Sequence, residues 1–443
     1  MSQSYPLVFR RAMYNLRGGF LIRPLIIALA LGGAGALCSW IEEAYPSISE
    51  WVPVFIFPSH ADPQVAQVIL GGIAASMMTV VSIVFAILLM TLTLASMQFS
   101  PRIIVSFAKD RVTQWTLGIF LGTFCYCMAA LPAARSAPRP FAPVATVLGA
   151  MVLALTCVGW LLYFIHHISQ AISVNHIVHR IATETESMID EMMPWPRHSE
   201  RMQHGGAPAL FPEEIALWSL ESGYIRFIDT RRLATLARQF RVRIRVLRRV
   251  GHFVPAGIPL MMVGKGARLS PDESGQLLAA FDFGPTRTLQ QDIEFGVLQI
   301  VDIALKAISP AVNDPSTAIS CVDQLSRIMI RFASRQPPED SLYDPPGTIR
   351  VHVAWIGFGR LLDAAFEQIR MYSKTDVAVS LRLLRALGDI TASTSDPEYR
   401  RLLAERGSRI VAGCAERLGK DEMKELRERL TLLESCLEPP ALL

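Results

Sequence analysis

The apolar and polar positions of the chain fall into two regions. Residues 20–165 are nearly free of charge, whereas residues 170–443 carry most of the Asp, Glu, Lys and Arg side chains. Four apolar runs in the first region are long enough to cross a hydrocarbon core of about 30 Å, and none contains a charged side chain or a histidine. The pattern therefore predicts a four-helix transmembrane domain over residues 1–165. Its helices are expected at residues 24–41, 67–99, 112–131 and 143–165.

Composition supports this picture and excludes one class of partner. The chain has 443 residues, of which 51% are hydrophobic, and its mean hydropathy of +0.33 is above that of ordinary soluble proteins. The lipid bilayer is therefore its first expected partner. The net charge of +4 is too small to indicate a nucleic-acid binder, so no nucleic-acid partner is expected.

The lysines and arginines of the short loops predict the orientation. They are concentrated in the N-terminal tail (residues 10–23) and in the loop after the second apolar run (residues 100–111). The loop after the first run (residues 42–66) has none. By the positive-inside rule, both termini are expected in the cytoplasm, with the helices in a bacterial inner membrane. The outer loop carries instead the acidic residues Glu42, Glu43, Glu50 and Asp62.

The second apolar run is the most informative, because small and hydroxylated residues line one of its faces. At about 33 residues it makes roughly 50 Å of helix, more than the hydrocarbon core needs. Large side chains such as Met77 and Val84 occupy the opposite face. Such a stripe either packs helices closely together or forms the wall of a polar conduit, and both interpretations stay open. The candidate pore-lining residues are Gly72, Ser76, Thr79, Ser82, Ala86, Thr93, Ser96 and Ser100, with Arg102 at the inner end.

Glycines in two other runs predict close helix packing. Gly118 and Gly122 form a G-x-x-x-G pattern in the third run, and Gly32, Gly33 and Gly35 cluster in the first. Small residues at these spacings let the backbones of two membrane helices approach each other. The pattern is common in membrane proteins, so it predicts packing and no particular function.

The polar half of the chain predicts a cytoplasmic α+β domain. Residues 166–212 are interpreted as a helix followed by a Pro- and Gly-rich linker, and strand-like alternation over residues 213–265 predicts a small β-rich module. Residues 266–443 are expected to be mainly helical, with a loop at 340–347 and a strand at 349–355. The expected fold class is thus a mainly α polytopic membrane protein with a cytoplasmic α+β domain, made of the small β module and C-terminal helices. Those helices are expected at residues 357–373, 377–391, 398–418 and 422–437.

A break between two predicted helices, at residues 309–316, is the most distinctive feature of this domain. Asp314 is placed to cap the second helix and Pro315 to occupy its first position. Asp302 and Lys306 on the first helix have the spacing of an i, i+4 pair. Oxygen ligands near the break could instead converge on a cation, but capping with solvated carboxylates is the favoured interpretation. The cation ligands considered are Asp292, Glu294, Asp302, Asn313, Asp314 and Asp323.

The motifs of common enzyme classes are missing from the sequence. It contains no nucleophile elbow, P-loop or H-E-x-x-H motif. We therefore expect no enzyme, no catalytic residues, and no bound metal or cofactor.

Four long motifs stand out along the chain. They are SMQFSPR (96–102), DRVTQWTLGIFLGTFCY (110–126), GHFVPAGIPL (251–260) and, most specifically, QIVDIALKAISPAVNDPSTAISCVDQL (299–325). Together they resemble one bacterial family, the predicted membrane proteins classed as domain of unknown function 2254. The resemblance covers roughly residues 10–430 and implies a membrane region followed by a cytoplasmic domain, with no settled activity.

A second, shorter resemblance concerns residues 251–263. The stretch GHFVPAGIPLMMV is similar to the closing hairpin of biotinyl- and lipoyl-type barrel-sandwich modules. Lys265 does not have the usual surroundings of a carrier lysine, so no modification is expected there.

Two functions follow from these observations. The first is a homo-oligomeric channel or conduit for small ions or solutes, gated by the cytoplasmic domain. One chain with a single polar stripe cannot enclose a pore, so symmetric repetition of the second run would be needed. Charge selection would then come from the mouths, with Arg102 at the inner one and Glu42, Glu43 and Glu50 at the outer one. The alternative is a membrane-anchored sensor or scaffold whose cytoplasmic domain binds a ligand or partner.

Overall fold

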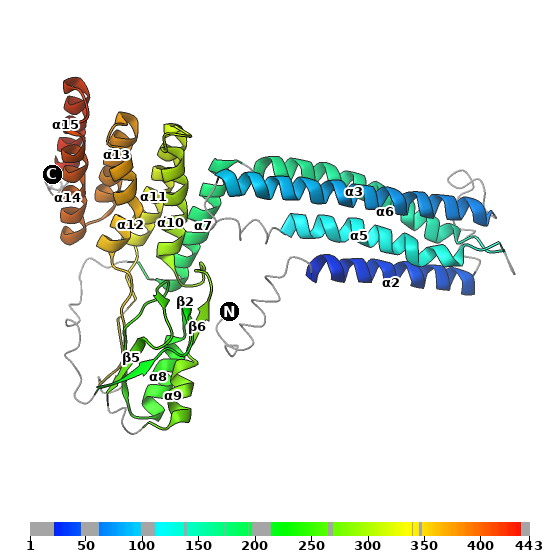
Figure 1. The fold of residues 1–443 in the computed structure, drawn as a ribbon, viewed down its shortest axis with the longest axis horizontal. Helices are drawn as coiled ribbons and strands as arrows, with labels where there is room; N and C mark the ends of the chain where they lie inside the picture. Colours follow the sequence, from blue (N-terminus) through cyan, green and yellow to red (C-terminus); the bar gives the residue numbers. More distant parts are fainter. Residues whose placement is uncertain are drawn as a thin grey trace. The chain divides into compact units, whose positions relative to one another are not determined.

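The structure, a computed structural model, divides into two compact units (Figure 1). The first, called the membrane unit, is Met1–Ser173, and the second, called the C-terminal unit, is Val174–Leu443. The residues that the structure describes are 22–45, 62–98, 111–136, 140–171, 173–193, 195–196, 214–264, 269–338, 340–344 and 348–435.

Four long apolar helices make up most of the described part of the membrane unit. They are α2 (Ile22–Ala44), α3 (Pro63–Gln98), α5 (Arg111–Ala130, followed by the 3-10 turn η2 at Leu131–Ala133) and α6 (Val144–Ala171). Each is long and apolar enough to cross a membrane, which confirms the predicted transmembrane region. Helix α3 has 36 residues, or about 54 Å of helix, and so exceeds the thickness of a hydrocarbon core.

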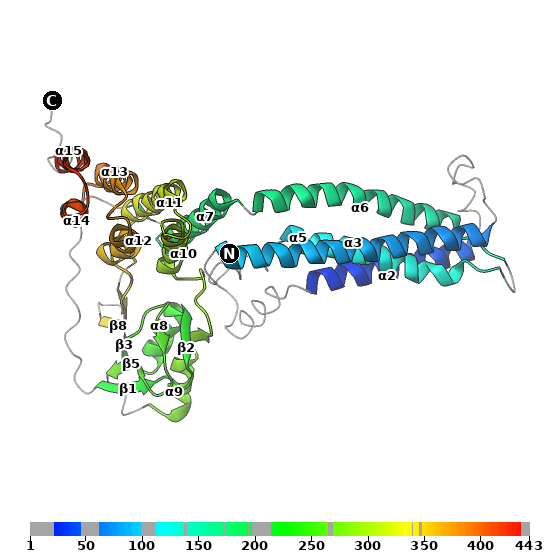
Figure 2. The same cartoon turned by 45° about the horizontal axis from the view of Figure 1, so that its top comes forward.

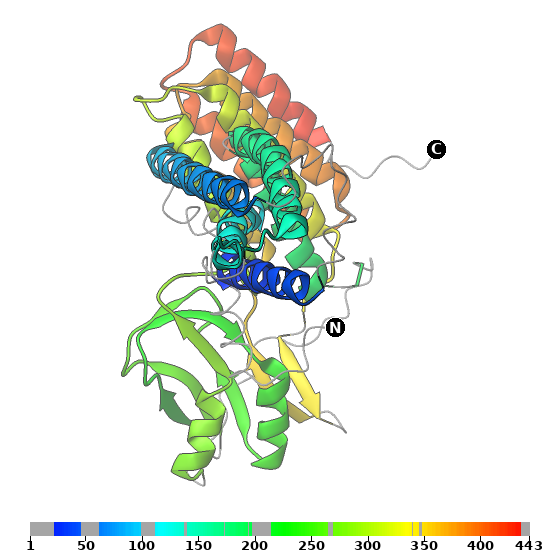
Figure 3. The same ribbon diagram turned by 90° about the vertical axis from the view of Figure 1, so that its right-hand side faces the viewer.

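Helix α5 contacts the other three helices of the membrane unit, and Figure 3 shows α2, in dark blue, beside it. An added Cβ at Gly35 would lie 2.5 Å from the carbonyl oxygen of Tyr126 on α5. An added Cβ at Gly118 would lie 2.7 Å from an isoleucine side chain of α2, and one at Gly122 would lie 2.5 Å from a leucine side chain of α2. These three glycines therefore allow the close approach of α2 and α5, as predicted. Gly33 does not take part, because its added Cβ would meet nothing within 4 Å.

The C-terminal unit begins with helix α7 (Val174–Met192) and contains two β-sheets. The strands are β1 (Glu214–Trp218), β2 (Gly223–Ile228), β3 (Arg243–Val246), β4 (Phe253–Val254), β5 (Pro259–Gly264), β6 (Phe281–Gly284), β7 (Ser341–Asp344) and β8 (Thr348–Val353). The larger sheet has the order β1-β5-β3-β8-β7 and the smaller one β4-β2-β6. All neighbouring strands are antiparallel except β3 and β8, which are parallel.

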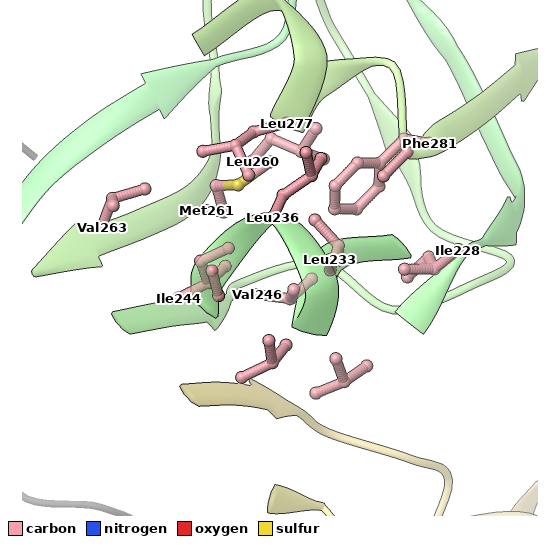
Figure 4. Packing of buried hydrophobic residues seen from close by; sticks show 14 of the residues in the cluster. Ile228, Leu233, Leu236, Ile244, Val246, Leu260, Met261, Val263, Leu277 and Phe281 are labelled. Carbon is pink, nitrogen blue, oxygen red and sulfur yellow. The ribbon is translucent and has the colours of Figure 1, made fainter. Parts of the chain in front are cut away.

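Apolar side chains of both sheets form one core with helices α8 (Thr230–Gln239) and α9 (Pro271–Leu278) (Figure 4). Ile244 and Val246 of β3 point into this core, whereas Arg243, the first residue of the strand, is exposed. Leu233 of α8 and Leu277 of α9 are fully buried against the strands. The alternation that predicts a β-rich module thus reflects one buried and one outward face.

Three details of the β structure differ from the sequence analysis. β7 occupies four residues of the loop expected at 340–347, because its backbone pairs with β8. β6, β7 and β8 extend the two sheets beyond residue 265, the predicted end of the module. β4 and β5 lie in different sheets, so the expected hairpin within residues 251–263 does not form. The pairing of β6 with β2, the pairing of β8 with β3 and the separation of β4 from β5 depend on segments far apart in the sequence, which local alternation does not reveal. β7 instead pairs with its neighbour in the sequence, β8.

The remaining helices pack beside the sheets in two rows, which Figure 2 shows as α11, α13 and α15 over α10, α12 and α14. They are α10 (Ile293–Ala307), α11 (Pro315–Ala333), α12 (Phe358–Tyr372), α13 (Val377–Ser393), α14 (Pro397–Cys414) and α15 (Lys420–Ser435). Helix α11 contacts α7, α10, α12 and α13, and α13 contacts α14 and α15. The predicted helices of this region are confirmed to within a few residues. Four of them begin at an aspartate N-cap, namely Asp292, Asp314, Asp376 and Asp396.

Candidate functional site

Helix α3 presents two different faces. Leu70, Met77 and Val84 are buried against the other membrane helices. The small and hydroxylated face lies roughly opposite and is exposed in the protomer, as expected from a period of 3.6 residues per turn. Ile83 and Met90 lie among these small residues and are exposed too. The exposed pore-lining candidates are Gly72, Ser76, Thr79, Ser82, Ala86 and Thr93.

Packing within the protomer does not require the small residues of this face. A Cβ added at Gly71 or Gly72 would meet nothing within 4 Å, in contrast to the glycines between α2 and α5. Close packing by this stripe therefore has no partner among the described residues of the same chain. If the stripe serves packing, the surface against it lies outside the described residues of this chain or belongs to another molecule.

The hydroxyl groups of the stripe are bonded to their own helix. Ser76 donates to the carbonyl of Gly72 at 2.8 Å, and Thr79 donates to that of Ala75 at 3.1 Å. Ser82 and Thr93 donate in the same way to the carbonyl four residues earlier, at 2.9 and 2.8 Å. Each hydroxyl proton is thus satisfied without water, while the oxygen keeps lone pairs that can accept. The face is compatible with lipid, with a second protein surface and with water.

The predicted outer mouth is corrected by the structure. Glu42 is only 1% exposed and accepts hydrogen bonds from the backbone N–H groups of Ala145 and Thr146, at 2.8 and 2.9 Å. It therefore caps the N-terminus of α6 rather than facing a water-filled opening. Glu43 is paired with Arg135. The sequence analysis missed both roles because the partners lie about a hundred residues away along the chain.

Three other candidates for the conduit are not placed by the structure. Ser100 and Arg102 lie outside the described residues, as does Glu50. Ser96 belongs to the last turns of α3, but its side chain is outside the described part. The candidate face is therefore defined from Gly72 to Thr93.

The break between α10 and α11 is a capped helical corner. Asp314 accepts from the backbone N–H of Thr317 at 3.1 Å and from its hydroxyl at 2.6 Å, and these bonds hold the pKa of Asp314 below its ordinary value. Pro315 is the first residue of α11, as predicted. Asn313 adopts a left-handed conformation with φ of 50°. Asp302 and Lys306 are half-buried on α10, and their pairing stays a prediction.

The carboxylates considered for a cation point to arginines instead. Asp292 accepts two hydrogen bonds from Arg287, at 2.7 and 2.8 Å. Asp323 pairs with Arg382 of α13. Within the described residues, no group of three or more His, Cys, Asp or Glu side chains is arranged to hold a metal ion. Capping and ion pairing therefore account for these residues better than a cation does.

A buried ion-pair cluster joins the β-sheets to the start of α10. Glu294 accepts from Arg249 at 3.0 Å and from Arg287 at 3.1 Å, and both arginines are largely buried. Burial alone would raise the pKa of Glu294, but the charges of the two arginines hold it below its ordinary value. Burial and the charge of Arg249 lower the pKa of His252, whose Nε2 accepts from Arg249 Nε at 3.0 Å.

Sequence reasoning did not identify this cluster. Its arginines lie in loops outside any periodic segment, and their partners are up to 45 residues away. The one local signal is Gly251, whose φ of 85° favours glycine and whose Cα faces Asp292 and Arg287. A glycine beside Arg249 and His252 therefore marks the place where backbone and ion pairs approach closely.

Comparison with known proteins places the chain in a family. The family model described as "Predicted membrane protein (DUF2254)" matches residues 17–389. The chain belongs to this family. An uncharacterized protein of Mycobacterium bovis, Mb1321c, is 31% identical over 422 residues, which span 93% of this chain and 79% of the relative. The uncharacterized protein Rv1290c of Mycobacterium tuberculosis matches to the same extent. No solved structure matches the chain.

Proposed function

We propose that this DUF2254 protein is a homo-oligomeric inner-membrane channel for small ions or solutes, gated by its cytoplasmic domain. The observation that carries the proposal is the exposed, small and hydroxylated face of α3, from Gly72 to Thr93, which points away from the packed face of the same helix. In this proposal the chain conducts and does not catalyse.

A ring of identical chains supplies the pore that one chain lacks. Among the described residues, helices α5 and α6 cover the opposite face of α3 and leave the small face exposed, so in this proposal it meets its copies around an axis. Small residues let the α3 helices approach that axis closely, and their hydroxyl oxygens offer acceptors to a passing ion. Closed rotational symmetry is the usual arrangement of homo-oligomers.

The selectivity of such a pore would be modest. The small face of α3 carries no formal charge over the residues whose side chains the structure describes. Glu42 caps the N-terminus of α6 and Glu43 forms an ion pair with Arg135, so they do not form an acidic outer ring. Discrimination between cations and anions would then rest on Arg102, which follows α3 in the sequence, and on Glu50 of the outer loop.

The orientation belongs to the same proposal. Arginines and lysines lie before α2 and after α3, and there are none between α2 and α3; this asymmetry supports the proposal that both termini are in the cytoplasm. A C-terminal alkaline phosphatase fusion is expected to be inactive and a C-terminal green fluorescent protein fusion to be fluorescent. An active phosphatase fusion would contradict this orientation.

Cysteine accessibility tests the conduit directly. In a full-length chain without native cysteines, Thr79→Cys and Ser82→Cys should react with a membrane-impermeant thiol reagent, and the modification should alter ion flux into proteoliposomes. Val84→Cys is the matched control, because Val84 is fully buried on the opposite face of the same helix. Equal labelling of Thr79→Cys and Val84→Cys, or silent proteoliposomes with no labelling, would refute the conduit.

A membrane-anchored sensor or scaffold is the second candidate. The specific observation in its favour is that the α3 hydroxyls donate to their own helix and so need neither water nor an ion. Oligomers that cross-link through Thr79→Cys but conduct nothing would favour this candidate. In that case the stripe packs copies together and the C-terminal unit carries the function.

A further inference from the structure

One end of the C-terminal unit is fixed by the pairing of α7 with α11. Arg327 donates to Glu186 at 2.9 Å, and Arg331 donates to Asp190 at 2.8 Å. In each pair the two partners are 141 residues apart in the sequence. Because this separation is the same in both pairs, α7 and α11 run parallel, and each residue of α7 lies beside the residue of α11 that follows it by 141 positions. The same offset places the first turn of α7 beside the first turn of α11. The corner between α10 and α11 therefore lies at the end of the unit where α7 begins.

This end of the unit is tied to the bilayer by the chain itself. The membrane-spanning helix α6 ends at Ala171, and α7 begins at Val174. Three residues of chain span at most about 11 Å. Whatever angle the units adopt, the N-terminus of α7 stays within that distance of the last residue of α6. A surface beside the start of α7 is thus confined near the membrane at a high effective concentration.

Two helical corners expose apolar side chains at this end. Val312, in the corner between α10 and α11, is 51% exposed. Met371 and Tyr372, at the end of α12, are 52% and 72% exposed. The two corners abut, because Asn313 and Tyr372 line one cavity of about 290 Å³ between them. Pro310 and Ala311 are exposed as well, so the first corner presents a continuous apolar segment.

We propose that this pair of corners, called the apolar corner patch (residues 310–312 with Met371 and Tyr372), contacts the headgroup–acyl boundary of the bilayer that holds the protein. Tyrosine is enriched at that depth because its ring is apolar and its hydroxyl is wet. Short apolar segments held at the surface bury their side chains there. The patch thus gives a physical role to the exposed Pro-Ala-Val segment of the most distinctive motif in the chain, beside the capping role of Asp314. The proposal does not depend on whether α3 lines a pore.

The test uses the unsubstituted chain first. The protein is reconstituted in vesicles that contain a phosphatidylcholine with a diazirine near the top of its acyl chain, and cross-linked peptides are identified by mass spectrometry. Peptides with residues 309–314 and 371–375 should carry lipid adducts. The turn between β1 and β2 is the control, because its Leu220 is 78% exposed but lies in the β part of the unit. Adducts at Leu220 alone, or at neither place, would overturn the proposal.

Spin labels then distinguish lipid from a protein partner. In a cysteine-free background, nitroxides at Val312→Cys and Tyr372→Cys should show a several-fold higher ratio of oxygen to nickel-chelate collisions than a nitroxide at Leu220→Cys. Equal ratios at the three sites would mean that the patch is in water and would overturn the proposal. Loss of both kinds of collision at the patch would mean that a protein covers it, which would also overturn it. Because the adducts come from the native chain, failure of a variant to fold does not remove the test.

Discussion

Two aspartates with the same capping geometry but different surroundings provide a matched test of the buried cluster. Asp292 and Asp314 each accept a hydrogen bond of 3.1 Å from the backbone N–H three residues later. Asp292 is 4% exposed and is also bonded to Arg287, whereas Asp314 is half-buried and its other bond is to the hydroxyl of Thr317. Substitution by asparagine keeps a good N-cap but removes the charge. Substitution by alanine removes both.

The expected free energies differ because of the ion pair. Asp314→Asn should change stability by at most about 0.5 kcal/mol, and Asp314→Ala should cost about 1 kcal/mol as a lost cap. Asp292→Asn should cost about 2–3 kcal/mol, because it leaves the buried Arg287 with Glu294 as its remaining carboxylate. This is below the usual cost of breaking a buried pair, since Glu294 still compensates part of the charge. Asp292→Ala should cost about 1 kcal/mol more than Asp292→Asn.

Native-state hydrogen exchange of the full-length protein in detergent provides the measurement. Opening free energies are compared for amides of α10 in the Asp292 variants and for amides of α11 in the Asp314 variants. The difference between alanine and asparagine should be the same at both positions. The difference between asparagine and the native residue should be large at Asp292 alone. Equal asparagine effects at the two positions would refute the view that a buried charge pair holds the start of α10.

Three further results are expected. The pKa of His252 is lowered in the folded protein, so the unfolded chain takes up its proton first as the pH falls. Stability should therefore fall as the pH drops below about 6.5, and His252→Gln should flatten that fall in thermal melts. An unchanged pH profile in this variant would contradict the role of the bond between His252 and Arg249. Gly35→Val should lower the melting temperature of the protein in detergent by several degrees, because Gly35 lies against α5. Gly72→Val should leave the melting temperature unchanged and reduce only the fraction of oligomer. Equal shifts in melting temperature would show that both glycines pack within the protomer. Glu42→Ala should cost roughly 1–3 kcal/mol by leaving the start of α6 without its carboxylate, and a neutral effect in the same melts would refute the capping role.

Features set by local sequence were predictable. The apolar runs predict the four membrane helices because crossing a bilayer requires length and hydropathy alone. Asp314 and Pro315 predict the start of α11 because an N-cap is a contact over three residues. The period of α3 predicts which of its side chains share a face. It does not predict that the small face is the exposed one, because that depends on where α5 and α6 pack.

Features set by distant partners were not predictable in the same way. Arg287 and Asp292 are close in sequence, but the cluster also needs Arg249, which arrives from the loop after β3. Glu42 reads as an acidic loop residue until its partner, the start of α6, is known. The strand β8 lies beside β3, which is about a hundred residues earlier in the sequence. Each of these depends on a three-dimensional contact that a single sequence does not report.

The parallel pairing of β3 with β8 has a consequence for how the protein is made. β3 ends at Val246 and β8 begins at Thr348, so about a hundred residues leave the ribosome between two neighbouring strands of one sheet. At roughly 5–20 residues per second, β3 waits on the order of 5–20 seconds with an open edge. During that time α10 and α11 are synthesised and can pack against α7, which directly follows the membrane helices in the sequence. A nascent chain arrested before Thr348 should therefore expose the unpaired edge of β3 and be more prone to aggregation than one released after Val353.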